Sequence, residues 1–283
     1  MAPRKLIVNA DDFGLSEKVN EGIVQAHSNG VVTSTSIIAN GIAFEHALEL
    51  CHSTPTLDLG VHLTLVEEKP LSDKQDIPSL VDKSGCFYHH ATVFIRRYLL
   101  SHLSLDEVRC ELDLQVRKVL DSGLKVSHLD GHQHIHMLPA ISRIVYQLAS
   151  KYNIPAVRYP RERLKSYMFR EKGSFSKILK LLLLNTFCAF SDGKDSRHPD
   201  HFVGVFYAGR LDKRNLQRVI ENLPTDGICE LVCHPGLHDP RGKYQHWQYR
   251  WQNEVDALTD RKIKDLLRRN GIELISYREL TNY

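Results

Sequence analysis

Short apolar runs alternate with amphipathic stretches along most of the chain. Runs rich in β-branched and other apolar residues predict eight strands, at residues 6–10, 31–40, 59–65, 124–127, 155–160, 201–206, 228–233 and 272–276. Apolar positions at helical spacing predict helices at residues 17–24, 43–50, 92–100, 105–120, 141–151, 175–187, 213–223 and 254–269. Strands that alternate with helices form βα units, so the pattern predicts an α/β fold with mainly parallel strands, either a (β/α) barrel or an incomplete version of one.

Polar residues mark the starts of several predicted helices. Ser16, Ser104 and Asp212 each precede an amphipathic stretch, where a side-chain oxygen can cap the first turn. By contrast, residues 67–90 show no periodicity and contain two prolines. A loop of this length in a compact domain is typical of a segment that covers a functional site.

Titratable side chains gather where the predicted strands end. Asp11 and Asp12 follow the first strand, and His62 lies in the third. His132 belongs to a run of nine residues, 128–136, that contains four histidines and an aspartate, and His234 ends the strand that Pro235 stops. The carboxyl ends of parallel strands meet at one face of a barrel, so we expect these side chains to converge.

One carboxylate and two imidazoles would make a three-ligand site with open positions for Zn²⁺ or another divalent ion. Such an ion can acidify a bound water and polarise a carbonyl oxygen. Hydrolysis also needs a base for the water and an acid for the leaving group. The other aspartate of the Asp11–Asp12 pair could supply the base and a histidine across the site the acid, which predicts metal-assisted hydrolysis of an amide or ester.

Composition restricts the class of protein. The chain has 283 residues and a formal net charge of +3, which does not favour nucleic-acid binding. Its six cysteines are scattered and form no C-x-x-C pair, as is typical of a reducing compartment. There is no stretch with the length of a transmembrane helix and no signal-like N-terminus, so we expect a cytoplasmic protein.

Residues 165–190 differ from the rest, because a strongly apolar helix carries several lysines and arginines. One interpretation is a helix packed on the core or at a dimer interface, and we expect a homodimer. The other is a basic, apolar helix that rests on a membrane surface near a lipid-like substrate, which would make the protein membrane-associated.

Five segments together resemble the YdjC-like carbohydrate deacetylases, the family that includes chitooligosaccharide deacetylase. They are residues 7–14 (IVNADDFG), 31–36 (VVTSTS), 60–64 (GVHLT), 128–137 (HLDGHQHIHM) and 233–236 (CHPG). The resemblance implies a single deacetylase domain over residues 1–283 with a distorted, TIM-like (β/α) barrel. It further implies a divalent metal ion, Zn or Mg, and a substrate that is an N-acetylated amino sugar.

The resemblance also implies roles for individual residues. Asp12, His62 and His132 would bind the metal, and Asp11 would be the general base. His234 is the candidate general acid, by analogy with other metal-dependent sugar deacetylases. Residues 79–85, 156–162, 200–204 and 234–240 are similar to the hopanoid-biosynthesis-associated (HpnK-type) branch, which implies an N-acetylglucosaminyl lipid as substrate. Gln133 stands where chitooligosaccharide deacetylases carry another histidine, and we interpret this position as lying behind the metal ligands.

Two other hypotheses stay open on the sequence. A glycoside hydrolase would pair Asp11 or Asp12 with Asp130 or Glu162 and would need no metal. A sugar- or metal-binding protein without turnover would use the histidines structurally. For Arg158 and Arg161 the alternatives are contact with the substrate or simple exposure to solvent. For His134 and His136 they are support of the metal ligands or a place at the barrel mouth, and for Trp247 and Trp251 sugar stacking or core packing.

Overall fold

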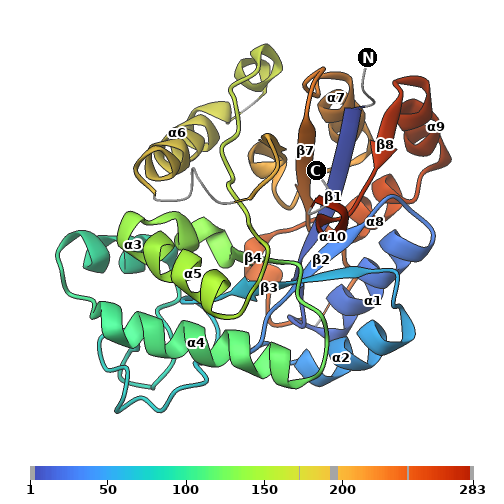
Figure 1. Ribbon diagram of the computed structural model, residues 1–283. Coiled ribbons are helices and arrows are strands. Elements are labelled where there is room, and N and C mark those ends of the chain that lie inside the picture. The colour runs from blue at the N-terminus through green and yellow to red at the C-terminus, as the bar shows by residue number, and fades with distance from the viewer. Residues whose placement is uncertain (1–3, 172, 192–196, 241, 281–283) are drawn as a thin grey trace.

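The computed structural model describes residues 4–171, 173–191, 197–240 and 242–280, and its centre is one curved parallel sheet. The strands are β1 (Arg4–Phe13), β2 (Ser34–Ile37), β3 (Asp58–Leu63), β4 (His128–Gly131), β5 (Ala156–Val157), β6 (His201–Val203), β7 (Ile228–Cys233) and β8 (Ile272–Leu274). Seven follow the order β5-β4-β3-β2-β1-β7-β6, and β8 pairs with the first residues of β1 (Figure 1). Every pairing between these strands is parallel.

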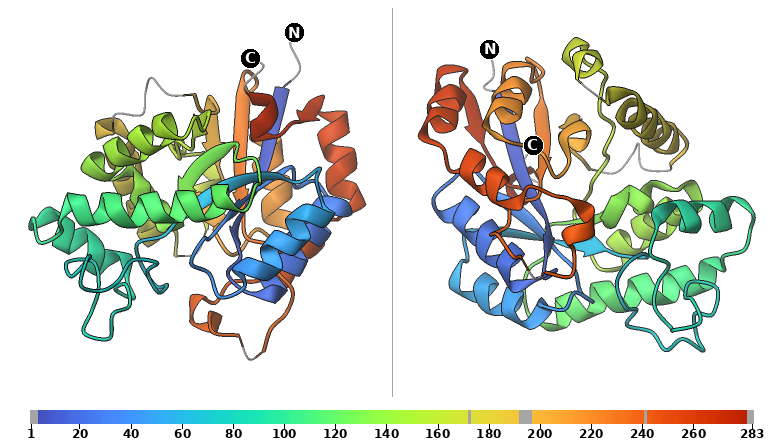
Figure 2. Two further views of the ribbon diagram at one scale, coloured as in Figure 1. Left: turned by 60° about the horizontal axis from the view of Figure 1, so that its bottom comes forward. Right: turned by 180° about the vertical axis from the view of Figure 1, so that it is seen from behind.

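Helices cover the outside of this sheet. They are α1 (Glu17–Ser28), α2 (Phe44–Ser53), α3 (Ala91–Leu99), α4 (Leu105–Asp121), α5 (Pro139–Lys151), α6 (Ser174–Phe190), α7 (Lys213–Glu221), α8 (Trp251–Leu258), α9 (Arg261–Arg269) and α10 (Tyr277–Leu280). In Figure 1, α1 and α2 lie at the lower right and α3 and α5 at the left, with α4 along the bottom, and Figure 2 shows the curl of the sheet from two further directions. Among the described residues, no helix is both long enough and apolar enough to cross a bilayer.

The sheet closes only weakly between its outer strands β5 and β6. There the ladder is reduced to one isolated parallel bridge, between Glu162 and Phe202. The Glu162 carboxylate is buried and accepts hydrogen bonds from the backbone N–H groups of Gly204 (3.2 Å) and Phe206 (3.1 Å), which tie the two edges together. The predicted fold is therefore confirmed as a distorted (β/α) barrel with a poorly paired seam.

Most predicted elements are confirmed, including the caps. The side chains of Ser16, Ser104 and Asp212 accept from the backbone N–H groups of Val19, Glu107 and Asn215. The single helix expected over residues 254–269 is wrong, because the chain forms α8 and α9 instead. The Asp260 carboxylate accepts from the N–H of Lys262 at 2.7 Å and starts a new helix at this point.

Two strands differ from the prediction where polar residues point inward. The strand expected at residues 124–127 lies instead at 128–131, because β4 pairs through Leu129 with Val61 of β3. His128 and Asp130 flank Leu129 and are fully buried among polar partners, so the apolar pattern did not reveal them. Likewise, β1 continues beyond residue 10 to include both aspartates.

Candidate functional site

The end of β1 brings two consecutive carboxylates into the interior. In a regular strand, neighbouring side chains point to opposite faces. Here the register with β2 shifts between Ala10 and Phe13, and Asp12 adopts a φ of 71°, which is rare for a residue other than glycine. Such a bulge re-aims side chains, and Asp11 and Asp12 are both almost completely buried.

Asp12, His62 and His132 meet at the carboxyl ends of β1, β3 and β4. Oδ1 of Asp12 lies 3.4 Å from Nε2 of His62 and 3.1 Å from Nδ1 of His132. One ligand atom from each residue lies within 4.8 Å of the other two, as in a group that can hold a metal ion. The second oxygen of Asp12, Oδ2, is buried and has no hydrogen-bond partner. The structure thus brings together three residues that the sequence analysis assigned to a metal.

A carboxylate stands behind each of the two imidazoles. Nδ1–H of His62 donates to Asp130 at 2.8 Å, which leaves Nε2 facing Asp12. Nε2–H of His132 donates to Glu67 at 2.9 Å, which leaves Nδ1 facing Asp12. Histidines that bind metals commonly donate their other N–H to a carboxylate in this way, because the bond fixes the tautomer and the ring orientation.

The close approach of acids and imidazoles shifts their pKa values in opposite directions. Burial alone would raise the pKa of Asp12, but its hydrogen bond and attraction to His132 lower it below its usual range. Burial alone would lower the pKa of His132, but bonds to Asp12 and Glu67 raise it to about 10. The pKa of His62 is also raised, because Asp130 outweighs the effect of burial. Without a metal, the site holds protons at neutral pH.

Asp11 has a different partner from its neighbour. Both of its oxygens accept from the guanidinium of Arg158, each at 2.7 Å, and Oδ1 also accepts from the Asn9 amide at 2.9 Å. Burial alone would raise the pKa of Asp11, but the Arg158 charge lowers it well below its usual range. Asp11 is therefore ionised at any working pH.

Arg158 itself is completely buried, so the interpretations of it as a substrate contact or as a solvated arginine are both wrong. Besides Asp11, its guanidinium contacts Asp130 at 2.8 Å and Glu230 at 2.8 Å. Asp130 in turn accepts from His62, so the Arg158 guanidinium binds all three of the carboxylates that lie beneath the site. Arg161, by contrast, is exposed.

His234 follows β7 directly and lies close to the carboxylate pair. Its positive charge, when present, lowers the pKa of both Asp11 and Asp12. The backbone N–H of His234 donates to the buried Glu254 at 2.6 Å, its ring packs edge-on against Tyr249, and its Nδ1 is buried without a partner. The ring therefore keeps a polar atom available inside the site.

Sequence reasoning missed Glu67, and it named Trp247 only as a residue for sugar stacking or core packing, not as a neighbour of His132. Trp247 stacks on His132, with ring centroids 5.2 Å apart, and its Nε1–H donates to Glu67 at 3.0 Å. Gln133 also donates to Glu67, at 3.2 Å, so it lies behind His132, in agreement with the interpretation of that position. The only available signal for Glu67 was its place in the long loop expected to cover a site.

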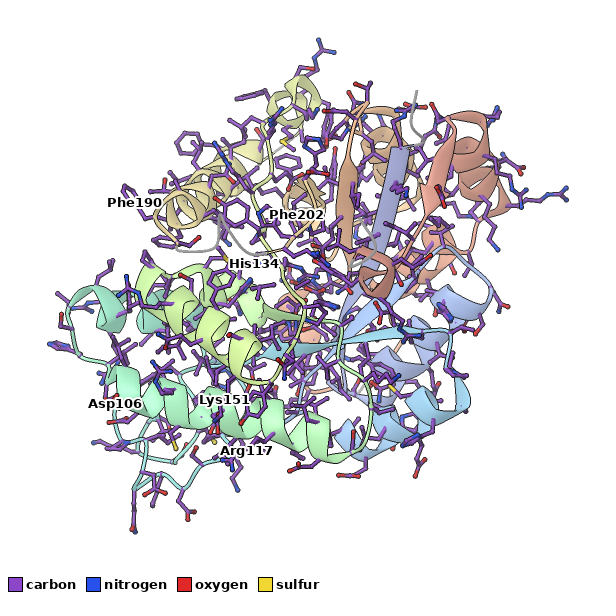
Figure 3. The ribbon with its side chains drawn as sticks, in the orientation of Figure 1. Asp106, Arg117, His134, Lys151, Phe190 and Phe202 are labelled. Atoms are coloured by element: carbon purple, nitrogen blue, oxygen red, sulfur yellow. The ribbon has the colours of Figure 1, made fainter. Side chains whose placement is uncertain are left out.

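The other histidines of the motif turn away from Asp12. His136 Nε2–H donates to the carbonyl of Arg158 at 3.2 Å. His134 packs edge-on against Phe202, and Figure 3 shows the two side chains near each other below α6. Both contacts brace the segment η1 (His132–Met137) against β5 and β6, which is a structural role.

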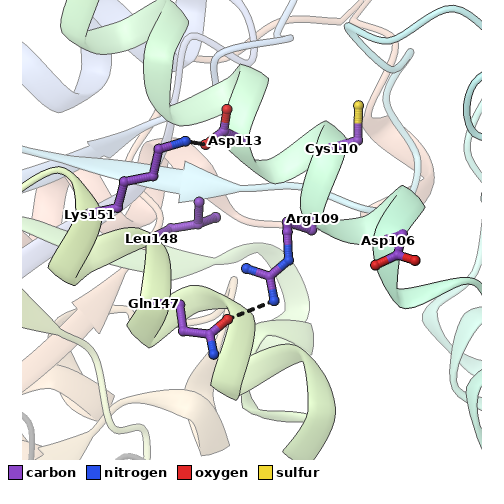
Figure 4. A pocket seen from close by; sticks show the side chains of 7 residues that line it. All are labelled: Asp106, Arg109, Cys110, Asp113, Gln147, Leu148 and Lys151. Atoms are coloured by element: carbon purple, nitrogen blue, oxygen red, sulfur yellow. Dashed lines mark hydrogen bonds and ion pairs between the residues drawn. The ribbon is translucent and has the colours of Figure 1, made fainter.

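Two clefts lie on the surface of the described residues, and one of them is close to the site. One, of about 530 Å³, is lined by residues 238–240, 245 and 249–253 and shares Tyr249 with the surroundings of His234. The other, of about 320 Å³, lies between α4 and α5. Figure 4 shows two pairs among the residues that line it, Lys151 with Asp113 and Arg109 with Gln147. None of the residues that line the α4–α5 cleft belongs to the site at the strand ends.

Comparison with known proteins agrees with the sequence resemblance. A family model described as YdjC-like protein matches residues 5–269. A carbohydrate deacetylase of Brevibacillus brevis is 36% identical over 278 residues, which cover 98% of this chain and 99% of the relative. The crystal structure of a proposed cellobiose-phosphate cleavage protein from Enterococcus faecalis V583 is similar with a TM-score of 0.76 and 30% identity, over 99% of both chains. The chain belongs to the YdjC-like protein family.

Proposed function

We propose that this protein is a divalent-metal-dependent N-deacetylase that hydrolyses the N-acetyl group of a sugar or glycolipid containing N-acetylglucosamine. The curated relatives named carbohydrate deacetylase support the reaction class. The observation that carries the proposal is the orientation of three groups. The unpartnered Oδ2 of Asp12 is buried beside two imidazole nitrogens whose rings are fixed by carboxylates.

Asp12, His62 and His132 would hold the ion. Two imidazoles and one carboxylate favour Zn²⁺ over Mg²⁺, which prefers oxygen ligands. When bound, such an ion polarises the acetyl carbonyl and lowers the pKa of a water molecule. Its entry requires that His132, whose pKa is raised, give up a proton.

Asp11 and His234 would move the protons of the reaction. Asp11 is ionised and held in place by Arg158, so it can take the proton of the attacking water. The water oxygen first bonds to the acetyl carbon, and the C–N bond of the acetamide then breaks, which releases acetate and an amine. Since an amide anion is a poor leaving group, the nitrogen needs a proton as it departs. His234, on the neighbouring strand end, would donate it.

The decisive experiment is acetate release from N-acetylglucosamine oligomers, with and without a chelator. We expect turnover that is abolished by chelation and restored by Zn²⁺. His132→Ala should lose both bound metal and activity, whereas His134→Gln, two residues along the same segment, should retain both. If His132→Ala binds as much metal and releases acetate as fast as the unaltered chain, the assignment of the site is wrong.

A second candidate is cleavage of a glycosidic bond, which the name of the Enterococcus faecalis relative favours. The geometry argues against the proposed acid–base pairs, because Asp130 is bound to His62 and Arg158 while Glu162 binds backbone N–H groups at the barrel seam. Product analysis separates the two reactions. Shortened sugars formed in the presence of chelator would favour the glycosidase, and sugar binding without any product would favour a protein without turnover.

We further propose that the substrate is a glycolipid, as in the hopanoid-associated branch, and that α6 contacts the membrane surface. One stripe of α6 is buried against the core, through Leu181, Leu184 and Cys188. The opposite stripe leaves large apolar side chains exposed: Phe175 (81%), Leu179 (58%), Leu182 (45%), Leu183 (46%) and Phe190 (72%). Figure 3 shows Phe190 at the outer end of the helix, pointing away from the barrel.

The charge on α6 favours an anionic lipid surface as the partner of this apolar stripe. The helix has no acidic residue, and its Lys180 is exposed, whereas Nζ of Lys177 lies 5.1 Å from the centre of the Phe206 ring on the side that faces the core. Such a combination is typical of helices that lie in the interface of a bilayer. Cys188 and Leu184 pack with Met137, which ends the segment that begins at His132. A lipid surface at α6 would therefore lie near the site.

Vesicle sedimentation tests this contact. We expect the unaltered chain to bind vesicles that contain anionic lipid and to bind neutral vesicles less. Leu179→Glu/Leu183→Glu should abolish binding, whereas Leu164→Glu, an exposed leucine outside α6, should not. If the α6 variant instead splits a homodimer and leaves vesicle binding unchanged, the stripe is a subunit interface and the membrane proposal fails.

A further inference from the structure

A second group of potential metal ligands lies outside the Asp12–His62–His132 site. It consists of Glu67, His89 and His246, which we call the rim cluster. One ligand atom from each of the three lies within 4.8 Å of the other two. The cluster joins two loops, because Glu67 and His89 belong to the segment between β3 and α3, and His246 lies between β7 and α8.

The geometry of Glu67 makes it the common element of the inner site and the rim cluster. Its Oε2 accepts from His132, whereas its Oε1 accepts from Trp247 and lies 3.8 Å from Nε2 of His246. Trp247 and Gln133 hold the carboxylate in this orientation. Glu67 has a φ of 68°, which is uncommon for a residue other than glycine.

The two histidines of the rim cluster are exposed and brought together by the fold. The rings of His89 and His246 meet edge to face, with centroids 6.1 Å apart. The backbone N–H of Glu67 donates to the carbonyl of Tyr88 at 3.1 Å, so the long loop folds back to place His89 beside Glu67. A carboxylate that already approaches one imidazole, with a second imidazole close by, is the donor set of a zinc-type site.

We propose that Glu67, His89 and His246 bind a second divalent ion of the zinc class. Two imidazoles select a transition metal over Mg²⁺ or Ca²⁺. Ligands around one Zn²⁺ lie about 2 Å from it and so at most about 4 Å from each other, and the 3.8 Å between Oε1 of Glu67 and Nε2 of His246 already lies within this range. The bound ion ties the two loops together beside His132. Its binding does not require an ion at Asp12, so the proposal stands apart from the proposed deacetylase activity.

Zinc stoichiometry on the full chain tests the proposal. After Zn²⁺ titration and elemental analysis, we expect two ions per chain, the outer one removed first by a weak chelator. His89→Ala and His246→Ala should each weaken the outer ion by at least about tenfold, because removal of a direct ligand costs at least as much as removal of a group behind it. His102→Ala, an exposed histidine elsewhere, should still bind two ions.

Asp12→Asn separates the two sites. It should lose the inner ion and keep the outer one, and anomalous scattering at the zinc edge should then show a peak among Glu67, His89 and His246. One ion per chain at saturating Zn²⁺, located at Asp12, would overturn the rim proposal and leave the deacetylase proposal intact. If the His89→Ala/His246→Ala double variant retains two ions, the rim proposal is also wrong. A rim ion in a chain without deacetylase activity would contradict only the proposed deacetylase function.

Discussion

Replacement of Arg158 by methionine should destabilise the fold more than replacement of any surface arginine. Arg158 is fully buried, and its guanidinium contacts Asp11, Asp130 and Glu230 at 2.7–2.8 Å. Methionine can fill much of the same space but carries no charge and no donors. The variant therefore leaves buried carboxylates without their cation, which is the costly way to break an interior ion pair.

The expected size follows from these contacts. Loss of one partner of a buried ion pair costs about 3–5 kcal/mol, and here the bidentate pair with Asp11 is accompanied by contacts to Asp130 and Glu230. Burial raises the pKa of Glu230 to about 7 even though Arg158 and the Tyr277 hydroxyl, which donates to this carboxylate, lower it. Glu230 therefore adds least to the loss. We expect a loss of about 4 kcal/mol at pH 7, a large share of the roughly 5–15 kcal/mol that stabilises a typical protein.

The pH dependence identifies the origin of this loss. In the unaltered chain the pKa of Asp11 lies below its unfolded value of 3.8, so its contribution is present above that value and is lost only as pH falls through the lower, folded pKa. Without Arg158, burial raises the pKa of Asp11 above 3.8 and the carboxylate is protonated at a higher pH. The stability gap between the two chains should therefore shrink as pH falls from about 7 to about 4.5.

Urea unfolding followed by circular dichroism measures the gap at both pH values. Arg161→Met is the matched control, because this arginine is exposed three residues further along, and it should change stability by less than about 0.5 kcal/mol. A gap that is the same at both pH values would mean that packing, not charge, makes Arg158 important. A loss no larger than that of Arg161→Met would refute the reasoning altogether.

Three further predictions concern the inner site and the fold. Although burial lowers the pKa of His132, Asp12 and Glu67 raise it to about 10. A proton must therefore leave when Zn²⁺ binds, and Zn²⁺ affinity should rise at least about tenfold per pH unit between about pH 6 and 8. Competition with a chelator measures the affinity, and an affinity that does not change with pH would contradict the prediction. Asp260→Ala should cost about 1 kcal/mol in urea unfolding by removing the cap of α9, and an unchanged midpoint would argue against a capping role. Gly60→Ala should cost about 1–3 kcal/mol in the same assay, since a Cβ there would lie 2.3 Å from the His128 ring; a neutral effect would show that the ring can move.

The fold could be predicted where the apolar period is clear, and it could not where polar residues enter the interior. The alternation of strands and helices identified the barrel, and α4 matched its predicted range to within one residue. β4 was misplaced because its buried histidine and aspartate do not look like core residues. The break between α8 and α9 was missed because the apolar period continues across Asp260, and only the local hydrogen bond of its side chain restarts the helix.

The candidate site could be predicted in part, for a similar reason. Asp12, His62 and His132 all belong to strand ends, and strand ends converge wherever the sheet curves. Glu67 and Trp247 come from loops, whose paths depend on contacts that no local pattern encodes. Arg158 was misjudged because arginine is rarely buried. Only the three-dimensional arrangement of Asp11, Asp130 and Glu230 makes its burial tolerable.

Two adjacent aspartates acquire different chemistry because the bulge at the end of β1 turns them toward different partners. Asp11 faces Arg158, which holds both of its oxygens, so its position is fixed and it rests in the ionised form. Asp12 faces two imidazoles with one oxygen and leaves the other without a partner. A residue whose oxygens are both held by a guanidinium is poorly suited to bind a metal, whereas a free buried oxygen beside two histidines is suited to the metal role proposed for Asp12. The proposed division between base and ligand therefore follows from the partners of each residue, the Arg158 guanidinium for Asp11 and the two imidazoles for Asp12.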